Sequence, residues 1–213
     1  MKVLIACEES QAVCIAFRNR GHEAYSCDIQ DCSGNHPEWH IKDDVLKIIN
    51  DKWDLMIAHP PCTYLSYAGM PYWNKPGRKE KREEALEFFM KLYNAPINKI
   101  CIENPLGYPS KFIKHTQVIQ PFYFGDSYQK RTCLWLKNLP KLVHYNGDDL
   151  FGKNTHVSSG EFVYWTNKKT GKLKRQPKWY SDAFTNKQTD RQTARSKTFP
   201  RIANAMVEQW GSI

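Results

Sequence analysis

The fold is decided by an apolar run that ends at two prolines, WDLMIAHPPC, residues 53–62. The first six residues, Trp53–Ala58, have the composition of a strand that is buried on both faces of a sheet. Pro60 and Pro61 end this strand because proline cannot donate a ladder hydrogen bond. The sequence therefore predicts that Cys62 lies just beyond the end of a central strand and is exposed.

Strand and helix patterns alternate on both sides of this run. The predicted strands are 2–6, 23–27, 53–58 and 98–102, with later candidates at 118–122 and 132–135. The predicted helices are 10–20, 44–50, 79–93 and 202–210. Strands that alternate with helices form a mostly parallel sheet covered by helices on its faces. The sequence therefore predicts an α/β fold.

Polar or reactive side chains follow four of these strands. In a parallel sheet the carboxyl ends of the strands share one edge, and ligands bind there. We therefore expect the four groups to line one edge of the sheet. They are Cys7-Glu8-Glu9, Asp28, Pro61-Cys62 and Glu103-Asn104.

The net charge of +9 lies almost entirely in the last third of the chain. Residues 1–136 carry 17 Lys and Arg against 16 Asp and Glu, whereas residues 137–213 carry 14 against 6. Aromatic residues are interleaved with these basic residues, a pattern that favours a nucleic-acid partner. The alternative is a solvated basic surface that keeps the protein soluble.

Length and cysteine usage place further bounds on the protein. A chain of 213 residues predicts one large domain with at most a small additional lobe. No run approaches the ~20 apolar residues of a membrane span, so we expect no membrane partner. The seven cysteines are scattered and no secretory signal precedes them. They predict reduced thiols in a cytoplasmic protein. We expect a monomer or a small homo-oligomer.

Cys62 is the candidate nucleophile among these cysteines. A thiol held by a Pro-Pro turn at a strand end is rigid and exposed, and a nearby cation or helix start would activate it. Most cysteines are buried and unreactive, and we expect this of Cys14 and Cys101.

Four short motifs, in order along the chain, resemble those of the DNA cytosine carbon-5 methyltransferase family. Pro60-Pro61-Cys62 resembles its Pro-Cys motif, and Ile102-Glu103-Asn104-Pro105 resembles its Glu-Asn-Val motif. Gln129-Lys130-Arg131 resembles half of its Gln-x-Arg-x-Arg motif, and residues 201–206 are similar to its closing Gly-Asn-x-Val helix. The chain looks most like the small phage-encoded branch, which would place it in a bacterial host cell.

The resemblance implies a Rossmann-like methyltransferase fold and a catalytic set of Cys62, Glu103 and Arg131. Cys62 would add to carbon-6 of cytosine and so activate carbon-5. Glu103 would contact ring N3, and Arg131 would orient the base or its phosphate. The base would have to leave a duplex first, and Pro61, Asn104 and Gln129 would help to bind it.

S-adenosylmethionine is the cofactor that the resemblance implies. Its site would comprise Cys7, Glu8, Ser10, Asp28, Asp44, Pro60 and Asn204. Asp28 is placed for the ribose hydroxyls, and Asp44 for the adenine amino group unless it is instead a helix N-cap. The family has a glycine-rich loop after the first strand, whereas this chain has Cys7-Glu8-Glu9-Ser10-Gln11 without glycine.

The predicted organisation has three parts: a catalytic core at 1–136, a small basic irregular lobe at 137–197 and a closing helix at 198–213 that packs on the core. The family usually has a separate target-recognition domain, so a lobe of this size implies minimal sequence reading. Lys169, Lys174 and Arg175 in the lobe are expected to contact the nucleic-acid backbone, which positions the duplex without specifying its sequence.

Three alternatives remain open. The same fold could act on a free nucleotide, on RNA or on an amino group, although amino-methylating relatives have an acidic or polar residue before Pro-Pro and an aromatic one after it. A diverged relative could bind nucleic acid or a nucleotide without turnover. Cys27, Cys32, His36 and His40 are ligand types that zinc accepts, but without a Cys-x-x-Cys pair we expect no metal.

Overall fold

The computed structural model describes residues 1–146, 154–185 and 198–213. The chain divides into two compact units. Unit 1 comprises Met1–Ile119, Arg131–Val143 and Ala203–Ile213, and unit 2 comprises Gln120–Lys130 and His144–Ile202. Unit 2 therefore includes Gln120–Lys130, a segment that the sequence pattern assigns to the core.

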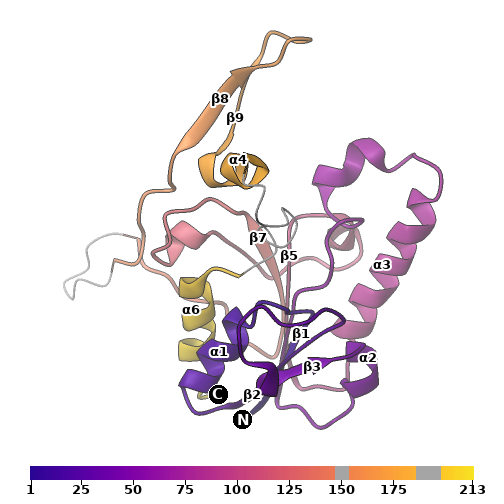
Figure 1. Cartoon of the computed structure of the whole chain (residues 1–213), viewed down its shortest axis with the longest axis vertical. Coiled ribbons are helices and arrows are strands. Elements are labelled where there is room, and N and C mark those ends of the chain that lie inside the picture. The colour runs from indigo at the N-terminus through magenta and orange to yellow at the C-terminus, as the bar shows by residue number, and fades with distance from the viewer. Residues whose placement is uncertain (147–153, 186–197) are drawn as a thin grey trace. The chain divides into compact units, whose positions relative to one another are not determined.

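Unit 1 is built on a seven-stranded sheet in the order β3-β2-β1-β4-β5-β7-β6 (Figure 1). Neighbouring strands from β3 to β5 pair in parallel, whereas β7 is antiparallel to both β5 and β6. The strands are β1 Lys2–Ala6, β2 Glu23–Asp28, β3 His40–Lys42, β4 Leu55–Ala58, β5 Lys99–Asn104, β6 Gln117–Ile119 and β7 Thr132–Lys137. This α/β architecture with a mostly parallel sheet is compatible with a Rossmann-like fold.

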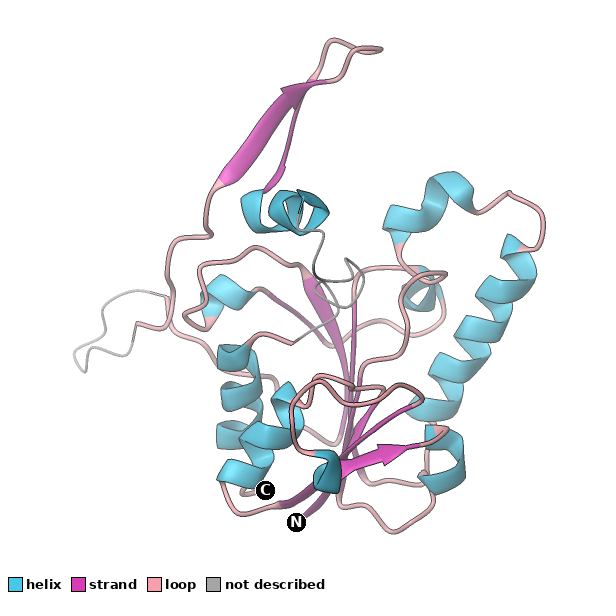
Figure 2. Ribbon diagram, viewed as in Figure 1, coloured by secondary structure: helices cyan, strands magenta, loops and turns pink. Residues whose placement is uncertain are grey.

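Helices cover both faces of this sheet. Figures 1 and 2 show α1 and α6 on one side of the strands and α2 and α3 on the other. The helices are α1 Ala12–Asn19, α2 Val45–Ile48, α3 Arg78–Tyr93 and α6 Pro200–Trp210. Short 3-10 helices lie at Pro37–Trp39, Tyr67–Tyr72, Tyr108–Lys111 and Pro121–Tyr123.

The central strands are buried because helices pack on both of their faces. All four residues of β4 are completely buried, as are Val3–Ala6 of β1. The prediction from the apolar run is confirmed here, although β4 begins at Leu55 and not at Trp53. Strand β3 was missed in the sequence because it has three residues, two of them basic or imidazole side chains.

The C-terminal helix packs within unit 1. Trp210 is completely buried, and its indole N–H donates to the carbonyl of Pro140 at 3.0 Å. The side chain of Gln209 pairs with both backbone groups of Val143, at 2.7 and 2.9 Å. These contacts explain how the last residues add to the core that the first 119 residues form.

Unit 2 contains the antiparallel hairpin of β8 Phe162–Thr166 and β9 Leu173–Pro177, followed by α4 Lys178–Thr185. The expectation of an irregular lobe is therefore wrong for these residues. Asn167 forms the turn, because its side-chain oxygen accepts from the N–H groups of Lys169 and Thr170. Gly171 completes the turn with φ at +65°, a conformation that glycine adopts without strain.

Within the described ranges, every helix is too short or too polar to cross a lipid bilayer.

Candidate functional site

The site is built at the carboxyl edge of the parallel strands in unit 1. The strand order reverses between β1 and β4, and the chain leaves these two strands toward opposite faces of the sheet (Figure 1). Such a reversal opens a crevice between the loops that follow the two strands. We call residues 59–67 and 103–108 the β4–β5 end of this edge, and residues 7–11, 28–36 and Asp44 the β1–β2 end.

Cys62 lies in a tight turn after β4. Pro60 is buried, whereas Pro61 and Cys62 are exposed. The carbonyl oxygen of Cys62 accepts from the backbone N–H of Leu65 at 3.1 Å and from that of Ser66 at 2.9 Å. The turn therefore holds the backbone of Cys62 while its side chain faces solvent.

The loop that carries Cys62 is joined to the loop after β5. The N–H of Tyr108 donates to the carbonyl of Leu65 at 2.7 Å, and the N–H of Tyr67 donates to Leu106 at 3.2 Å. Gly107 makes this contact possible, because a Cβ atom there would lie 2.1 Å from the Leu65 oxygen. The close approach of the two loops therefore requires glycine at position 107.

Glu103 is buried near the end of β5 and forms a pair with His59. This pairing follows from the register of the two strands. Ala58 lies opposite Ile102, so the next residues, His59 and Glu103, also lie side by side. Nδ1 of His59 is 2.8 Å from Oε2 of Glu103, and the two side chains are 10% and 9% exposed. Next along the strands, the amide of Asn104 donates to the carbonyl of Pro60 at 2.7 Å. These contacts fix the two strand ends against each other.

Arg131 lies at the same edge because β7 runs antiparallel to β5. It is exposed and directly precedes β7, and Cys133 lies opposite Asn104 in the ladder. The charges of Arg131 and Glu103 both act on Cys133: burial raises the pKa of this thiol to about 11, Arg131 opposes the rise and Glu103 adds to it. The three predicted catalytic residues therefore share the edge of neighbouring strands.

Cys62 differs from most of the other thiols. Burial raises the pKa of Cys14 to about 12 and that of Cys27 to about 11, and it also raises the pKa of Cys101. These thiols stay protonated at neutral pH, and thiols without exposure are poor nucleophiles. Cys62 is exposed, as a nucleophile must be.

The β1–β2 end gathers Cys7, Asp28 and Asp44. Burial raises the pKa of Cys7 well above its usual range, and the negative charges of Asp28 and Asp44 add to the rise. The three side chains are therefore near enough to interact electrostatically. Cys7 has φ at +58°, an uncommon conformation for a residue other than glycine, so the glycine-free loop still turns sharply.

The Glu8 side chain is used inside the protein. Its oxygens accept from the N–H groups of Val13 at 2.7 Å and Cys14 at 3.2 Å, at the start of α1. A carboxylate is favourable there because it satisfies helix N–H groups and the helix dipole. Burial raises the pKa of Glu8, and His59 and the two N–H donors oppose the rise. The structure therefore gives the Glu8 carboxylate a role in the fold, and a cofactor would meet this residue only through other atoms.

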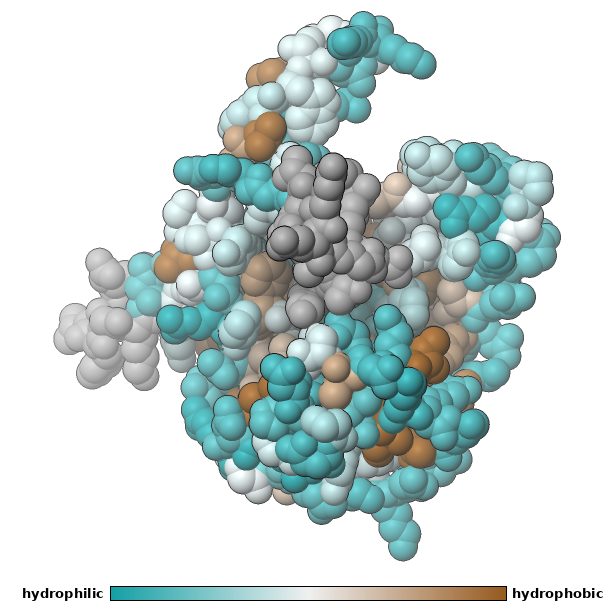
Figure 3. All heavy atoms as spheres, in the orientation of Figure 1, coloured by the Kyte–Doolittle hydropathy of each residue, from teal (hydrophilic) through white to brown (hydrophobic). Residues whose placement is uncertain are grey.

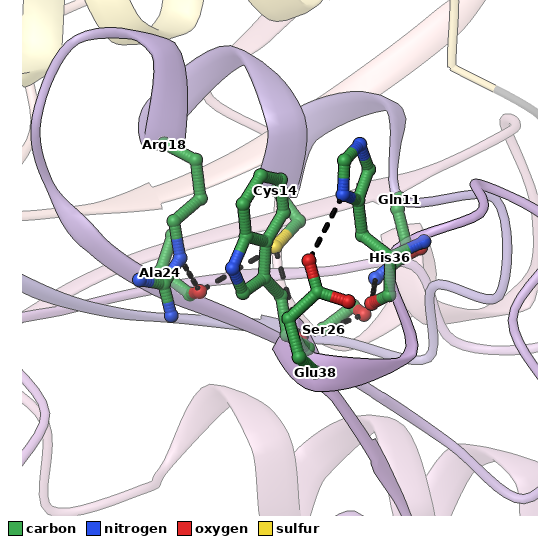
Figure 4. Close-up of polar contacts among 8 residues, drawn as sticks. Gln11, Cys14, Arg18, Ala24, Ser26, His36 and Glu38 are labelled. Atoms are coloured by element: carbon green, nitrogen blue, oxygen red, sulfur yellow. Dashed lines mark hydrogen bonds and ion pairs between the residues drawn. The ribbon is translucent and has the colours of Figure 1, made fainter.

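Two segments contact each other at the β1–β2 end. The side chain of Gln11 donates to the carbonyl of His36 at 2.8 Å and accepts from its N–H at 3.1 Å (Figure 4). Gly34 packs against this side chain, because an added Cβ would lie 2.6 Å from Cβ of Gln11. Ser10 is half-buried beside this contact.

The remaining predicted cofactor residues take separate positions. Asp44 caps α2, since its side chain accepts from the N–H of Leu46 at 3.0 Å, which is the N-cap alternative named above. Pro60 is buried and offers its carbonyl to Asn104. Asn204 is exposed on α6.

The predicted substrate residues fall in both units. Pro61 in unit 1 borders a hollow of about 410 Å³, whose other lining residues are Tyr64, Lys81, Glu84, Ala85 and Phe88. In unit 2, the carbonyl of Gln129 accepts from the indole of Trp179 at 3.2 Å. Lys169 lies in the hairpin turn, and Lys174 and Arg175 are exposed on β9.

Three of the four zinc-type ligands have other partners. The Cys27 thiol donates to the carbonyl of Asp43, Nδ1 of His40 lies 2.8 Å from the Ser26 hydroxyl, and His36 pairs with Glu38 (Figure 4). In the part of the chain that the structure describes, no group of three or more metal-type ligands occurs.

The sequence pattern did not predict His59 as a partner of Glu103. The available signal was the equal position of the two residues after neighbouring parallel strands, which places them side by side when the strands are in register. Fold and geometry thus define an α/β protein with a polar strand edge and an exposed thiol. No protein-family model matches the chain, and a search of curated proteins found no similar sequence.

Proposed function

We propose that this protein is an S-adenosylmethionine-dependent methyltransferase that acts on cytosine carbon-5 in DNA through a covalent adduct with Cys62. The observation that carries the proposal is the exposed thiol of Cys62, held by a turn that is hydrogen-bonded to the loop after Glu103. The strand order supports it, since 3-2-1-4-5 is the order found in doubly wound nucleotide-binding folds.

The residues of the β4–β5 end suit the chemistry. The Cys62 thiolate adds to carbon-6 of the ring as the 5,6 double bond opens, which makes carbon-5 nucleophilic. The Glu103 carboxyl group donates its proton toward ring N3 and so neutralises the negative charge that the adduct places on the ring. After methyl transfer, carbon-5 loses its proton to water and the sulfur of Cys62 is eliminated, which restores the ring and the thiolate. Arg131 orients the base or its phosphate by charge-assisted hydrogen bonds. When bound, S-adenosylmethionine supplies the methyl group.

The β1–β2 end fits the nucleoside part of this cofactor. Asp28 and Asp44 gather near Cys7 at the reversal point of the sheet, and carboxylates accept hydrogen bonds from ribose hydroxyls and amino groups. Asp28 already accepts from the N–H of Gln30 at 2.9 Å and Asp44 from that of Leu46, but a carboxylate has about four acceptor sites. Both residues therefore retain capacity for a ligand.

The β8–β9 hairpin supports nucleic acid as the substrate. Residues 162–177 contain five basic residues and no acidic ones. The ladder sets Tyr164 opposite Arg175 and Trp165 opposite Lys174, so each face of the hairpin presents an aromatic ring with a cation. Tyr164 is 56% and Trp165 42% exposed, and Figure 3 shows hydrophobic atoms among hydrophilic ones on this hairpin. Such a surface suits phosphates and exposed bases.

The chemical step is tested with labelled S-adenosylmethionine and duplex DNA of mixed sequence. We expect label on cytosine carbon-5 with the native protein and at least about a 10³-fold lower rate with Cys62→Ala, because removal of a nucleophile leaves only binding. Cys14→Ala, which removes a buried thiol on α1, is the matched control and should retain activity. Equal labelling by native protein and Cys62→Ala would refute the covalent mechanism.

The DNA-binding surface is tested by salt titration of binding. Replacing Lys169, Lys174 and Arg175 with alanine should lower the slope of log affinity against log salt by up to about 0.9 for each phosphate that is no longer neutralised. Lys91→Ala on α3 is the control, because Lys91 is exposed and already paired with Glu87 at 2.8 Å. An unchanged slope would place the DNA-binding surface elsewhere.

A second candidate function is a nucleic-acid-binding protein without turnover. The glycine-free loop after β1 favours it, because the Gln11 side chain in this loop packs tightly against Gly34, where the family has a glycine-rich loop. Calorimetric titration with S-adenosylmethionine separates the two functions. Measurable binding supports the methyltransferase, and its absence supports the second candidate.

A further inference from the structure

The buried pair of His59 and Glu103 has features that packing alone does not require. Both side chains are almost fully buried, and Nδ1 and Oε2 lie 2.8 Å apart. Nε2 of His59 is buried and has no hydrogen-bond partner among the described residues. A buried polar atom without a partner costs free energy, and such atoms in native proteins often belong to functional groups.

The charges around His59 come from two carboxyl groups on separate elements. Glu103 approaches from β5, and Glu8 lies in the loop after β1, close enough for His59 to lower the pKa of Glu8 against the larger effect of burial. Glu8 is itself held by the N–H groups of Val13 and Cys14. One imidazole is thus placed between two buried carboxyl groups at the ends of three adjacent strands, β1, β4 and β5.

The backbone around this pair is rigid. The N–H of His59 donates to the carbonyl of Ala6 at 2.9 Å, which ties it to β1. One residue further, the Pro60 carbonyl accepts from the Asn104 amide. His59 is therefore fixed on both sides, and a hydrogen bond from its ring fixes the Glu103 carboxyl group in turn.

We infer that His59 is a positioning residue for Glu103, and that the hydrogen-bonded pair, not Glu103 alone, is the ionising unit that meets the substrate ring. This inference rests on the proposed function. His59 holds one carboxyl oxygen in a fixed place. Glu103 therefore loses little side-chain conformational entropy when it binds ring N3. The protonation of the pair sets the pH range in which the Glu103 carboxyl group holds a proton for ring N3.

The test compares His59→Ala with His59→Asn. The amide nitrogen of asparagine can stand near the place of Nδ1 and donate to Glu103, but it does not ionise. We expect His59→Ala to lower kcat about 100-fold with little change in KM for DNA, because a misplaced catalytic group loses about this much. His59→Asn should recover kcat to within about tenfold of the native value. It should also lose one ionisation from the pH profile of kcat. His22→Asn, in the turn before β2, is the control for loss of an imidazole.

Two results would overturn the inference. One is a native kcat and pH profile in His59→Ala. The other is a His59→Asn variant that is as impaired as His59→Ala and keeps the native shape of the profile. Thermal unfolding of each variant shows whether reduced activity reflects reduced folding.

A second measurement separates this inference from the proposed function. The NMR resonance of the His59 Nδ1 nitrogen should shift in Glu103→Gln, because the carboxylate that it contacts at 2.8 Å becomes an amide. An unchanged Nδ1 resonance overturns the pairing even if methylation is observed. A changed resonance in a protein that methylates no DNA overturns the proposed function and supports the pairing.

Discussion

The two ends of the sheet edge in unit 1 are built in opposite ways. At the β4–β5 end, the ionisable pair of His59 and Glu103 is buried and the thiol of Cys62 is exposed. At the β1–β2 end, the thiol of Cys7 has a pKa raised by burial, whereas the carboxyl groups belong to Asp28, which is half-buried, and to Asp44, which is exposed. One fold thus separates groups that suit covalent chemistry from groups that suit hydrogen bonding to a ligand.

The β4–β5 end depends on a close backbone approach, and Gly107→Ala breaks it. The new Cβ would lie 2.1 Å from the Leu65 carbonyl, so the loops must separate. We expect a loss of about 1–3 kcal/mol in the free energy of unfolding, as for other overpacked sites. The rate of DNA methylation should fall about 100-fold as Cys62 shifts from Glu103.

Denaturant unfolding and the labelling assay measure these two effects. Gly21→Ala is the control, since no atom lies within 4 Å of the Cβ that this substitution adds. Because Gly21 has φ at +79°, its replacement by alanine should cost about 1 kcal/mol in backbone strain. Equal stability and activity of the two variants would show that the approach of the two loops is unimportant.

The sequence predicted the parts of this edge that depend on local pattern. The apolar run before Pro60 predicts β4 and the exposed Cys62, and strand ends predict where Glu103 and Asp28 lie. The His59–Glu103 pair depends on the register between β4 and β5, which no local pattern specifies. A single residue of slip would place different side chains opposite each other.

The β8–β9 hairpin shows a different limit of sequence reading. A strand is recognised by one apolar and one polar face, whereas here both faces of the hairpin carry an aromatic residue from β8 and a basic residue from β9. Val163 and Leu173 are 37% and 69% exposed, so neither face of the hairpin is buried. Without a buried face, the sequence does not alternate between apolar and polar residues. The clearest cue was the turn at Asn167 and Gly171.

The β1–β2 end is tested by Asp28→Asn. Loss of one charged hydrogen-bond acceptor should weaken S-adenosylmethionine binding about tenfold, which corresponds to about 1.4 kcal/mol. Asp44→Asn should have a similar effect without loss of stability, because asparagine is also a good N-cap for α2. Calorimetry measures both, with Asp51→Asn as a control, because Asp51 is exposed in the turn before β4, at the other edge of the sheet. Unchanged affinity in both aspartate variants would show that S-adenosylmethionine does not bind at this end.

The smallest expected effect is a loss of stability at alkaline pH. Burial raises the pKa of Cys133 from 9.0 to about 11, so between these values the unfolded chain has lost a proton that the folded protein keeps. The contribution of this thiol to stability is complete below pH 9 and decreases as the pH rises. At pH 9.5 the decrease is about 0.8 kcal/mol. Cys27, at the β1–β2 end, has a pKa raised to about 11 by burial and should behave alike.

The measurement compares unfolding free energies at pH 7 and pH 9.5 for native protein and Cys133→Ala. Other titrating groups contribute equally to both proteins, so the difference between their pH responses isolates the thiol. We expect the variant to lose less stability between the two pH values than the native protein, although it is less stable at each. An equal loss would mean that Cys133 ionises in the folded state. The charge of Glu103 would then not act on it as the ladder between β5 and β7 requires.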